Sequence, residues 1–560
     1  MTKRNALEGN PNRGHGEGRS FAPKPRCGGL SGKGIGCVAL VLAAGFVRAM
    51  DFVPLAEPTE VLIDGRLDKK GRIVRDADGT LILRGGTASR ITLVWRCDLG
   101  TTTKAFGGMW ERTYGDSAWR KLGATSAPRG GTHAWYVLTT DGLRTDGYGV
   151  KVQPNAFVCW RIRADCLELT LDVRAGSAPV ELGGRELALC TLVSRRGRAG
   201  ESAFAAGRAF CRAMCPTPRL AAAPVYGYND WYCAYGHNTA TNFLADAKFL
   251  LEAMDALPGD SVTNRPFMVV DDGWQNARHR GGDPSKPGGQ WGTVNARWGM
   301  PMAEFARQVK ALRAHPGLWY RPLMPDEGRT ALPVDPTDPK WKHRIREEMA
   351  RFVEWGMELV KIDFITYDWN DVWGYELEDS PVKKPLPAWR DRSRTTAEVI
   401  LELYRTMREA AGSRMLIVGC NAIDHFAAGL FELQRTGDDT SGREWARTRK
   451  MGPNTLGMRA IHNGIFYLND GDCVGLVKEG DVPWQLNRRW LDLVTRSGTA
   501  LFISWKRQLA TDPKIVHALG MAWKKASRPM ATGEPLDWLE TLRPRLWLFG
   551  DESRADYDWE

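Results

Sequence analysis

The chain of 560 residues is 43% hydrophobic and 26% charged, which is typical of a globular protein that buries a sizeable core. Its formal charge is +11, but residues 1–49 hold eight Lys/Arg and only two Glu, so more than half of the excess lies there. The remainder is too weakly basic, and has no basic run interleaved with aromatic residues, to favour a nucleic-acid partner. Such a length predicts about three or four domains, or one large barrel with a companion.

Residues 1–49 have the pattern of an export signal. An apolar run from Ile35 to Val47 follows a basic leader rich in Gly and Pro, and Val47-Arg48-Ala49 fits a cleavage site of small residues. The run is short for a membrane span, and no later segment has that character. We therefore expect an exported protein, periplasmic or extracellular, cleaved near Ala49 and without membrane insertion of the mature chain. A disordered tail with a chance apolar patch is the alternative.

The cysteines do not form a recognisable framework. Of the 11 Cys, Cys27 and Cys37 would leave with the signal. An odd number remains, without a Cys-x-x-Cys pair, although Cys211 and Cys215 lie one helical turn apart. We expect buried thiols, because a core of this size does not need cross-links.

Residues 51–200 predict an antiparallel β-sandwich. Stretches such as Leu167–Val173 and Ala188–Val193 alternate apolar and polar residues, and Gly/Asp turns separate many of the segments. The region holds no recognisable catalytic constellation, so its expected role is packing or shaping of the substrate site. Residues 201–223 predict a helix, from Glu201 to Cys215, and then a linker rich in Ala and Pro.

Strand, loop and helix then repeat over residues 224–530. Eight apolar stretches, as expected of strands buried on both faces, alternate with helical patterns and predict a (β/α)8 barrel. The predicted strands are Val225–Tyr228, Phe267–Val270, Leu318–Arg321, Leu359–Ile362, Met415–Val418, Leu430–Leu433, Ile465–Leu468 and Ala500–Ile503. The predicted helices include Thr239–Leu257, Pro301–Ala314, Lys340–Glu354 and Thr395–Ala411. Residues 531–560 predict a short tail or the start of a small β unit.

Acidic residues gather at the carboxyl ends of these strands, where barrel enzymes carry their chemistry. The segments are Asn229-Asp230-Trp231, Asp271–Trp274, Asp363, Cys420-Asn421, Asp438-Asp439 and Asn469–Asp472. A retaining glycosidase needs two carboxylates from different strands, one to attack the anomeric carbon and one to protonate the departing oxygen and activate water. Lys361 points the same way as Asp363 along the strand, so it can hold Asp363 ionised or bind sugar hydroxyls. A structural Lys–Asp pair is the alternative.

In this order the motifs resemble those of the α-galactosidase-type clan of glycoside hydrolases, families 27 and 36, and most of all family 36. The matching segments are Gly227–Trp231, Asp271–Trp274, Gly317–Trp319, Lys361–Asp363, Gly437–Ser441 and Asn469–Cys473. The resemblance implies an N-terminal β-sandwich, a linker helix and a catalytic barrel. It further implies a retaining exo-α-glycosidase acting on plant or algal oligosaccharides, with Asp363 as nucleophile and Asp438 as acid/base, Asp439 being the alternate.

The resemblance implies further roles around the sugar. Asp271 and Asp272 would bind the hydroxyls that fix the configuration of the sugar. Trp231 and Trp274 would wall the pocket, and Arg435 would contact the sugar and the acid/base. The structural alternatives are a turn former for Asp272, core packing for Trp274 and an ordinary ion pair for Arg435.

Three segments depart from the pattern of the family. Tyr320-Arg321-Pro322 stands where the family has an aliphatic-Glu-Pro segment, Cys420-Asn421 lacks the Gly-rich continuation, and Ser441 replaces the last Asp of the acid/base motif. Because these positions face the sugar in the family, galactose specificity does not follow. One hypothesis is that Arg321 recognises a charged or sulfated glycan, since Arg binds such groups with two hydrogen bonds. A structural Arg is the alternative.

Two other functions stay open from the sequence. A transglycosylase of the raffinose-synthase type would pass the same covalent intermediate to a sugar acceptor. A catalytically inactive barrel would only bind carbohydrate, although the presence of Asp363 and Asp438 argues against it. We expect an oligosaccharide or glycan as partner, and a homo-oligomer stays open. No metal or cofactor is expected, because the nine His form no ligand pair on the motif strands and no phosphate-binding loop follows a strand.

Overall fold

The computed structural model describes residues 50–100, 103–122, 131–277, 285, 290–326, 332–377, 379–382, 386–476, 482–505, 507 and 512–560. The predicted export signal, its cleavage site at Ala49, and Cys27 and Cys37 lie outside the described residues. The described residues from 50 onward form one unit, which contains a β domain and a closed barrel. Among the described helices, none combines the length and the hydropathy that a membrane span requires.

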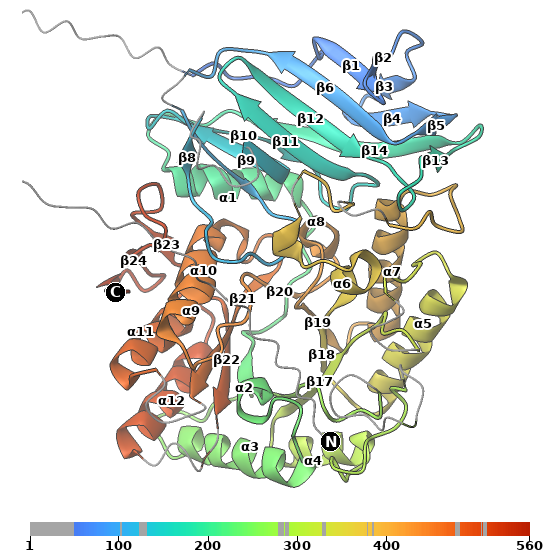
Figure 1. The fold of residues 1–560 in the computed structure, drawn as a ribbon. Helices are drawn as coiled ribbons and strands as arrows, with labels where there is room; N and C mark the ends of the chain where they lie inside the picture. The colour runs from blue at the N-terminus through green and yellow to red at the C-terminus, as the bar shows by residue number, and fades with distance from the viewer. Residues whose placement is uncertain are drawn as a thin grey trace, which may run out of the picture. The chain divides into compact units, whose positions relative to one another are not determined.

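The N-terminal domain is an antiparallel β domain, as the sequence predicts (Figure 1). Strand order in its main sheet is β2-β1-β6-β12-β11-β9-β10-β14-β4-β3, and β7 and β8 extend it beside β9. The strands are β1 (Glu60–Ile63), β2 (Arg66–Leu67), β3 (Ile73–Arg75), β4 (Thr80–Arg84), β6 (Arg90–Arg96), β7 (Lys104–Gly108), β8 (Arg120–Lys121), β9 (Thr132–Thr140), β10 (Thr145–Val150), β11 (Phe157–Arg163), β12 (Cys166–Asp172) and β14 (Glu186–Arg195). Two short strands, β5 (Thr87–Ala88) and β13 (Val180–Glu181), pair separately. Alternation along β4 buries every second side chain in the core.

Helix α1 (Ala203–Met214) follows this domain and packs against β10, as Figure 1 shows. The hydroxyl of Ser202 accepts a hydrogen bond from the N–H of Ala205 and caps the helix. Gly147 permits the close approach, because a Cβ there would lie 2.5 Å from the ring of Phe210. The helix also contacts residues 460–462 of the barrel domain, so it joins the two domains.

Eight parallel strands close into a barrel within the described residues, which confirms the predicted (β/α)8 architecture. They are β15 (Tyr226–Asn229), β16 (Phe267–Val270), β17 (His315–Tyr320), β18 (Leu359–Ile362), β19 (Leu416–Gly419), β20 (Leu433–Arg435), β21 (Leu468–Leu476) and β22 (Ala500–Trp505). Two of them begin later than predicted. The apolar residues from Leu430 and from Ile465 first form turns, in which their N–H groups bond to Ala427 and His462, and the strands start only afterwards.

Long helices surround the barrel strands in Figure 1. They are α3 (Ala240–Asp255), α4 (Met302–Ala311), α5 (Pro339–Glu354), α7 (Thr396–Ala411), α11 (Trp484–Arg496) and α12 (Pro513–Ala526). Side chains of Thr239, Asp338, Thr395 and Asp512 cap four of them, and Thr395 forms a capping box with Glu398. Short helices lie among the loops that follow the strands: α2 (Trp231–Ala234), α6 (Ile365–Asn370), α8 (Asp424–Ala427), α9 (Trp445–Arg449) and α10 (Thr455–Met458).

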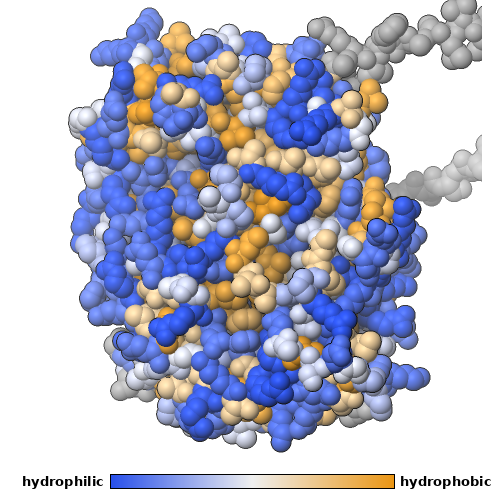
Figure 2. Space-filling model, turned by 180° about the vertical axis from the view of Figure 1, so that it is seen from behind, coloured by the Kyte–Doolittle hydropathy of each residue, from blue (hydrophilic) through white to orange (hydrophobic). Residues whose placement is uncertain are grey.

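The chain ends in a small antiparallel sheet. Its strands are β23 (Glu534–Pro535), β24 (Leu546–Leu548) and β25 (Arg554–Asp556). Buried Trp538, Trp547 and Trp559 fix this sheet to the rest of the core. The Cys residues of the described segments are free thiols, mostly buried, as the sequence predicts. The face drawn in Figure 2 is mainly hydrophilic, with smaller hydrophobic patches between the polar residues.

Candidate active site

Asp363 follows the last residue of β18. Its N–H donates to the carbonyl of Tyr320 on β17 at 3.0 Å, which keeps it in line with the sheet. Phe364 has a φ of 59°, a left-handed conformation that is unusual for an aromatic residue and common at functional sites. The turn lets the N–H of Phe364 donate to Asp363 Oδ1 at 2.8 Å, while Trp319 Nε1 donates to Oδ2 at 3.1 Å. Two neutral groups therefore hold this carboxylate.

Lys361 lies on the same strand and binds Asp271, which follows β16. Its Nζ is 2.7 Å from Asp271 Oδ2, and the same oxygen accepts from Asn229 Nδ2 at 2.8 Å. Burial would lower the pKa of Lys361, but Asp271 beside it raises that pKa well above its usual range, with a smaller contribution from Asp363. Lys361 is thus a permanent cation whose direct partner is Asp271, rather than Asp363 as expected.

Asp438 and Asp439 follow β20 and are surrounded by guanidinium groups. Asp438 Oδ1 is 3.1 Å from Arg112 Nη2, and its Oδ2 is 3.0 Å from Arg447 Nη2. Asp439 Oδ1 is 3.4 Å from Arg435 Nη2 and 3.6 Å from Arg112 Nη1. Burial would raise the pKa of Asp439, but Arg112 and Arg435 lower it to about 2. Cations therefore hold Asp438 and Asp439, whereas the direct hydrogen-bond donors to Asp363 are uncharged.

Asp472 supports the turn that carries these two carboxylates. It lies at a bulge in β21 with a φ of 70°. Its Oδ2 accepts from the N–H of Thr440 at 2.8 Å, from Arg435 Nη2 at 3.2 Å and from the hydroxyl of Tyr232. The segment Asn469–Cys473, matched in the sequence without an assigned role, thus reaches the site through Asp472.

The β domain contributes a segment that the sequence analysis did not assign to the site. Residues 110–117, between β7 and β8, extend to the barrel, and we call them the arm. The N–H of Thr113 donates to the carbonyl of Thr436 at 3.0 Å, and the N–H of Asp438 donates to the carbonyl of Thr113 at 2.9 Å. Gly115, with a φ of 76°, lets the arm pass, because a Cβ there would lie 2.2 Å from the carbonyl oxygen of Lys450. The β region, expected to pack against the barrel or to shape the substrate site, therefore also supplies Arg112 and Tyr114 to the lining of the cavity described below.

These groups surround a cavity of 370 Å³. Seven of the predicted residues line it: Trp231, Asp271, Asp272, Lys361, Asp363, Asp438 and Asp439. Six lining residues were not predicted from the sequence: Arg112, Tyr114, Trp319, Phe364, Trp373 and Arg447. Of these, Trp319 alone carried a signal, because it ends the motif Gly317–Trp319.

Trp274 and Arg321 lie outside this cavity. Trp274 is fully buried, donates through Nε1 to the carbonyl of Trp319 at 3.0 Å and packs edge-on against Phe352, so it belongs to the core and does not wall the pocket. Arg321 is 3% exposed, and its Nε is 2.9 Å from Asp368 Oδ2. Because that guanidinium is already paired, and stacks on Phe364, the hypothesis that it recognises a charged glycan is not favoured.

Cys420, Asn421 and Arg435 lie behind the residues that line the cavity. The Sγ of Cys420 accepts from Arg112 Nη1 at 3.3 Å and from Arg435 Nη1 at 3.4 Å. Asn421 Nδ2 donates to Glu111 Oε1 at 2.6 Å, and the N–H of Gly374 donates to the same oxygen at 2.9 Å. Burial raises the pKa of Glu111 to about 7. Cys420 and Arg435 thus contact the lining residue Arg112 or one another behind the cavity, and Asn421 contacts Glu111 of the arm.

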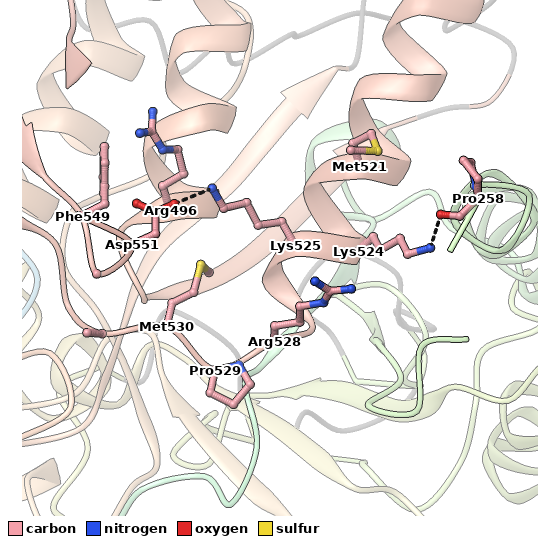
Figure 3. Close-up of a pocket in the computed structure, with 12 residues that line it drawn as sticks. Pro258, Arg496, Met521, Lys524, Lys525, Arg528, Pro529, Met530, Phe549 and Asp551 are labelled. Atoms are coloured by element: carbon pink, nitrogen blue, oxygen red, sulfur yellow. Dashed lines mark hydrogen bonds and ion pairs between the residues drawn. The ribbon is translucent and has the colours of Figure 1, made fainter. Parts of the chain in front are cut away.

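A larger cavity, of 560 Å³, lies between α11, α12 and the C-terminal sheet (Figure 3). Four basic residues line it, namely Arg496, Lys524, Lys525 and Arg528. Asp551 is the one carboxylate among the described lining residues, and Lys525 pairs with it at 3.4 Å. Lys524 donates to the carbonyl of Pro258 at 2.7 Å, as Figure 3 also shows. A cavity with a single, paired carboxylate cannot supply the two acids of a glycosidase, so we place the site in the smaller one.

The chain matches no family model and no curated protein. Among solved structures, the α-galactosidase TtGalA from Thermus thermophilus is 16% identical with a TM-score of 0.52, and the match covers 83% of this chain and 99% of that one. The GH36 α-galactosidase AgaA from Geobacillus stearothermophilus is 14% identical with a TM-score of 0.56, over 84% of this chain and 69% of its own. The chain therefore has the fold of the α-galactosidase-type glycoside hydrolases, with a β domain followed by a barrel. At such identities the likeness establishes the fold alone.

Proposed function

We propose that the chain is a retaining glycoside hydrolase of the α-galactosidase type, which releases terminal α-linked sugars from an oligosaccharide. One observation carries the proposal: Asp363 and the pair Asp438 and Asp439, from different strands, line the same cavity. Trp231 and Trp373, both partly exposed, line it as well and offer apolar faces to a sugar ring. The export signal predicted before residue 50 agrees with a substrate outside the cytoplasm.

In the first step of the proposed mechanism, Asp363 attacks the anomeric carbon and the bond to the leaving oxygen breaks. Asp438, with Asp439 as the alternate, gives its proton to that oxygen, and the sugar stays on Asp363 as an ester. In the second step, the same acid/base takes a proton from water. The water oxygen attacks the anomeric carbon, and the ester bond breaks to restore the carboxylate of Asp363.

The other polar groups of the cavity suit binding of the sugar hydroxyls. Asp271 and Asp272 offer acceptors, and Lys361 offers donors that its bond to Asp271 holds in place. These groups are fixed before a sugar arrives, so little order is lost on binding.

The first test is hydrolysis of a panel of 4-nitrophenyl α- and β-glycosides by the full chain. We expect turnover of one α-glycoside. The sugar released should be the α-anomer before it mutarotates, which ¹H NMR during the reaction detects. A 2-deoxy-2-fluoro glycoside of the same sugar should add its glycosyl mass to Asp363, read by peptide mass spectrometry. Turnover of β-glycosides only, or a first product of β configuration, would contradict the proposal.

The same assay separates the two alternatives. Longer oligosaccharides that form only when a sugar acceptor is added would identify a transglycosylase. Binding of sugars to the full chain without any turnover would identify a carbohydrate-binding barrel.

A further inference from the structure

The arm of the β domain contacts the acid/base segment through its backbone and its side chains. Thr113 pairs with the backbone of Thr436 and Asp438, as in a parallel sheet. The side chain next to it, Arg112, enters the cavity and is 7% exposed. The carboxylates that follow β20 of the barrel are therefore held partly by residues of the β domain, which precedes the barrel in the sequence.

Arg112 has partners on several sides. Its Nη2 is 3.1 Å from Asp438 Oδ1, its Nη1 is 3.6 Å from Asp439 Oδ1, and its guanidinium carbon lies 5.7 Å from the ring centre of Trp373. Burial would lower the pKa of Arg112, but Asp438 and other negative neighbours raise it well above its usual range. The side chain is thus a fixed cation at the acid/base carboxylate.

We propose that Arg112 is a positioning residue, which orients Asp438 for proton transfer to the leaving oxygen. This inference rests on the proposed function. Arg447, the other cation on Asp438, is 29% exposed, so the nearly buried Arg112 is the better-fixed partner. Other charged groups also act here, namely Arg435 on β20, Lys361 on β18, Asp363 after β18 and Asp472 on β21.

The test compares Arg112→Gln with Arg112→Lys on the sugar that the panel identifies. If Arg112 acts through the acid/base, Arg112→Gln lowers kcat/KM on the order of 10²-fold for a natural oligosaccharide, whose leaving group needs protonation. For a 2,4-dinitrophenyl glycoside, the loss in kcat/KM is less than about tenfold, because this leaving group departs with little help from a proton donor. Arg112→Lys retains the charge and loses less on the oligosaccharide.

Asn454→Ala is the matched control. Asn454 donates to the carbonyl of Ser117 at 2.9 Å, so its loss loosens the far end of the arm and leaves the charges in the cavity unchanged. Equal loss on both substrates in Arg112→Gln, or the same leaving-group dependence in Asn454→Ala, would overturn the inference. Absence of turnover by the wild-type chain would instead overturn the proposed function, and this inference with it. Melting temperatures show whether each variant folds. If Arg112→Gln does not fold, Arg112→Lys, which loses the two-pronged contact with Asp438 and Asp439, should still lose more on the oligosaccharide than on the dinitrophenyl glycoside, and an equal loss would overturn the inference.

Discussion

The two sides of the cavity hold their carboxylates by different means. Asp363 is bound by the indole of Trp319 and by a backbone N–H, both uncharged. Asp438 lies between Arg112 and Arg447. A nucleophile loses its charge when it forms an ester, so neutral partners oppose that step less than a cation would.

The two sides also differ in origin. The hydrogen-bond partners of Asp363 come from the barrel itself. The acid side needs the arm, because Arg112 and Thr113 come from the β domain. The domain predicted to pack against the barrel or to shape the substrate site thus supplies a cation and a backbone pairing to the acid side.

Removal of the proposed nucleophile should have the largest effect. Asp363→Asn keeps the shape of the side chain but replaces one acceptor oxygen by an NH2 group and cannot form the ester, so we expect kcat to fall on the order of 10⁴- to 10⁶-fold. Asp371→Asn, just after α6, is the control with no expected loss, since Asp371 does not line the cavity. Steady-state assays on the reactive aryl glycoside measure both. A variant at Asp363 with more than a tenth of wild-type activity would disprove its role.

Substitution of the proposed acid/base should reduce activity less than loss of the nucleophile, and the size of the reduction should depend on the leaving group of the substrate. We expect Asp438→Asn to lose on the order of 10²- to 10⁴-fold on oligosaccharides and much less on a dinitrophenyl glycoside. Added azide should restore turnover of the reactive glycoside and give a glycosyl azide. Asp439→Asn is the direct comparison. If the leaving-group dependence appears there instead, Asp439 is the proton donor, and if it appears in neither, the acid side is wrongly placed.

Glu111 gives a prediction for stability, because its folded pKa is about 7 against a usual 4.5. Between those pH values the unfolded chain releases a proton that the folded chain keeps, so this carboxyl lowers stability as pH rises from 4.5 to 7. Glu111→Gln removes that dependence. We expect the variant to gain on the order of 3 kcal/mol relative to wild type between pH 4.5 and pH 8, by urea unfolding. A constant difference across that range would show that Glu111 does not titrate there.

The smallest expected effect concerns the neutral partner of Asp363. Trp319→Phe removes one hydrogen bond to the carboxylate, so we expect about a tenfold loss in kcat/KM. Trp274→Phe removes an indole that bonds outside the cavity, and it should lower the melting temperature more than the activity. Comparing the two variants separates contact with the nucleophile from packing. Identical losses of kcat/KM in the two variants would mean that the hydrogen bond from Trp319 to Asp363 does not contribute to activity.

Much of the barrel could be predicted because its signals are local. The strands Phe267–Val270 and Leu359–Ile362 form as predicted, since short apolar runs buried on both faces have few other places to go. The acidic residues at the strand ends then allowed Asp271 and Asp363 to be predicted as site residues. The β20 start could not be predicted, because an apolar run gives no sign of where a turn ends and a strand begins.

The rest of the site depends on contacts between distant residues. Arg112 carries no local sign of its role, because its partner Asp438 belongs to another domain. Arg321 illustrates the reverse case, since its partner Asp368, 47 residues away, turns a suspected ligand-binding group into a structural pair. Sequence pattern assigns residues to strand ends, but only the three-dimensional path of the chain decides which of them meet.

The pairing of Thr113 with Thr436 has a consequence for folding, since it joins residues 323 positions apart. Contacts of such separation form late, after the segments between them have become ordered. The β domain leaves the ribosome long before β20 is made, so its arm has no partner during most of synthesis. Recovery of hydrolysis after denaturation should therefore lag behind recovery of secondary structure, and the lag measures the docking of the two domains.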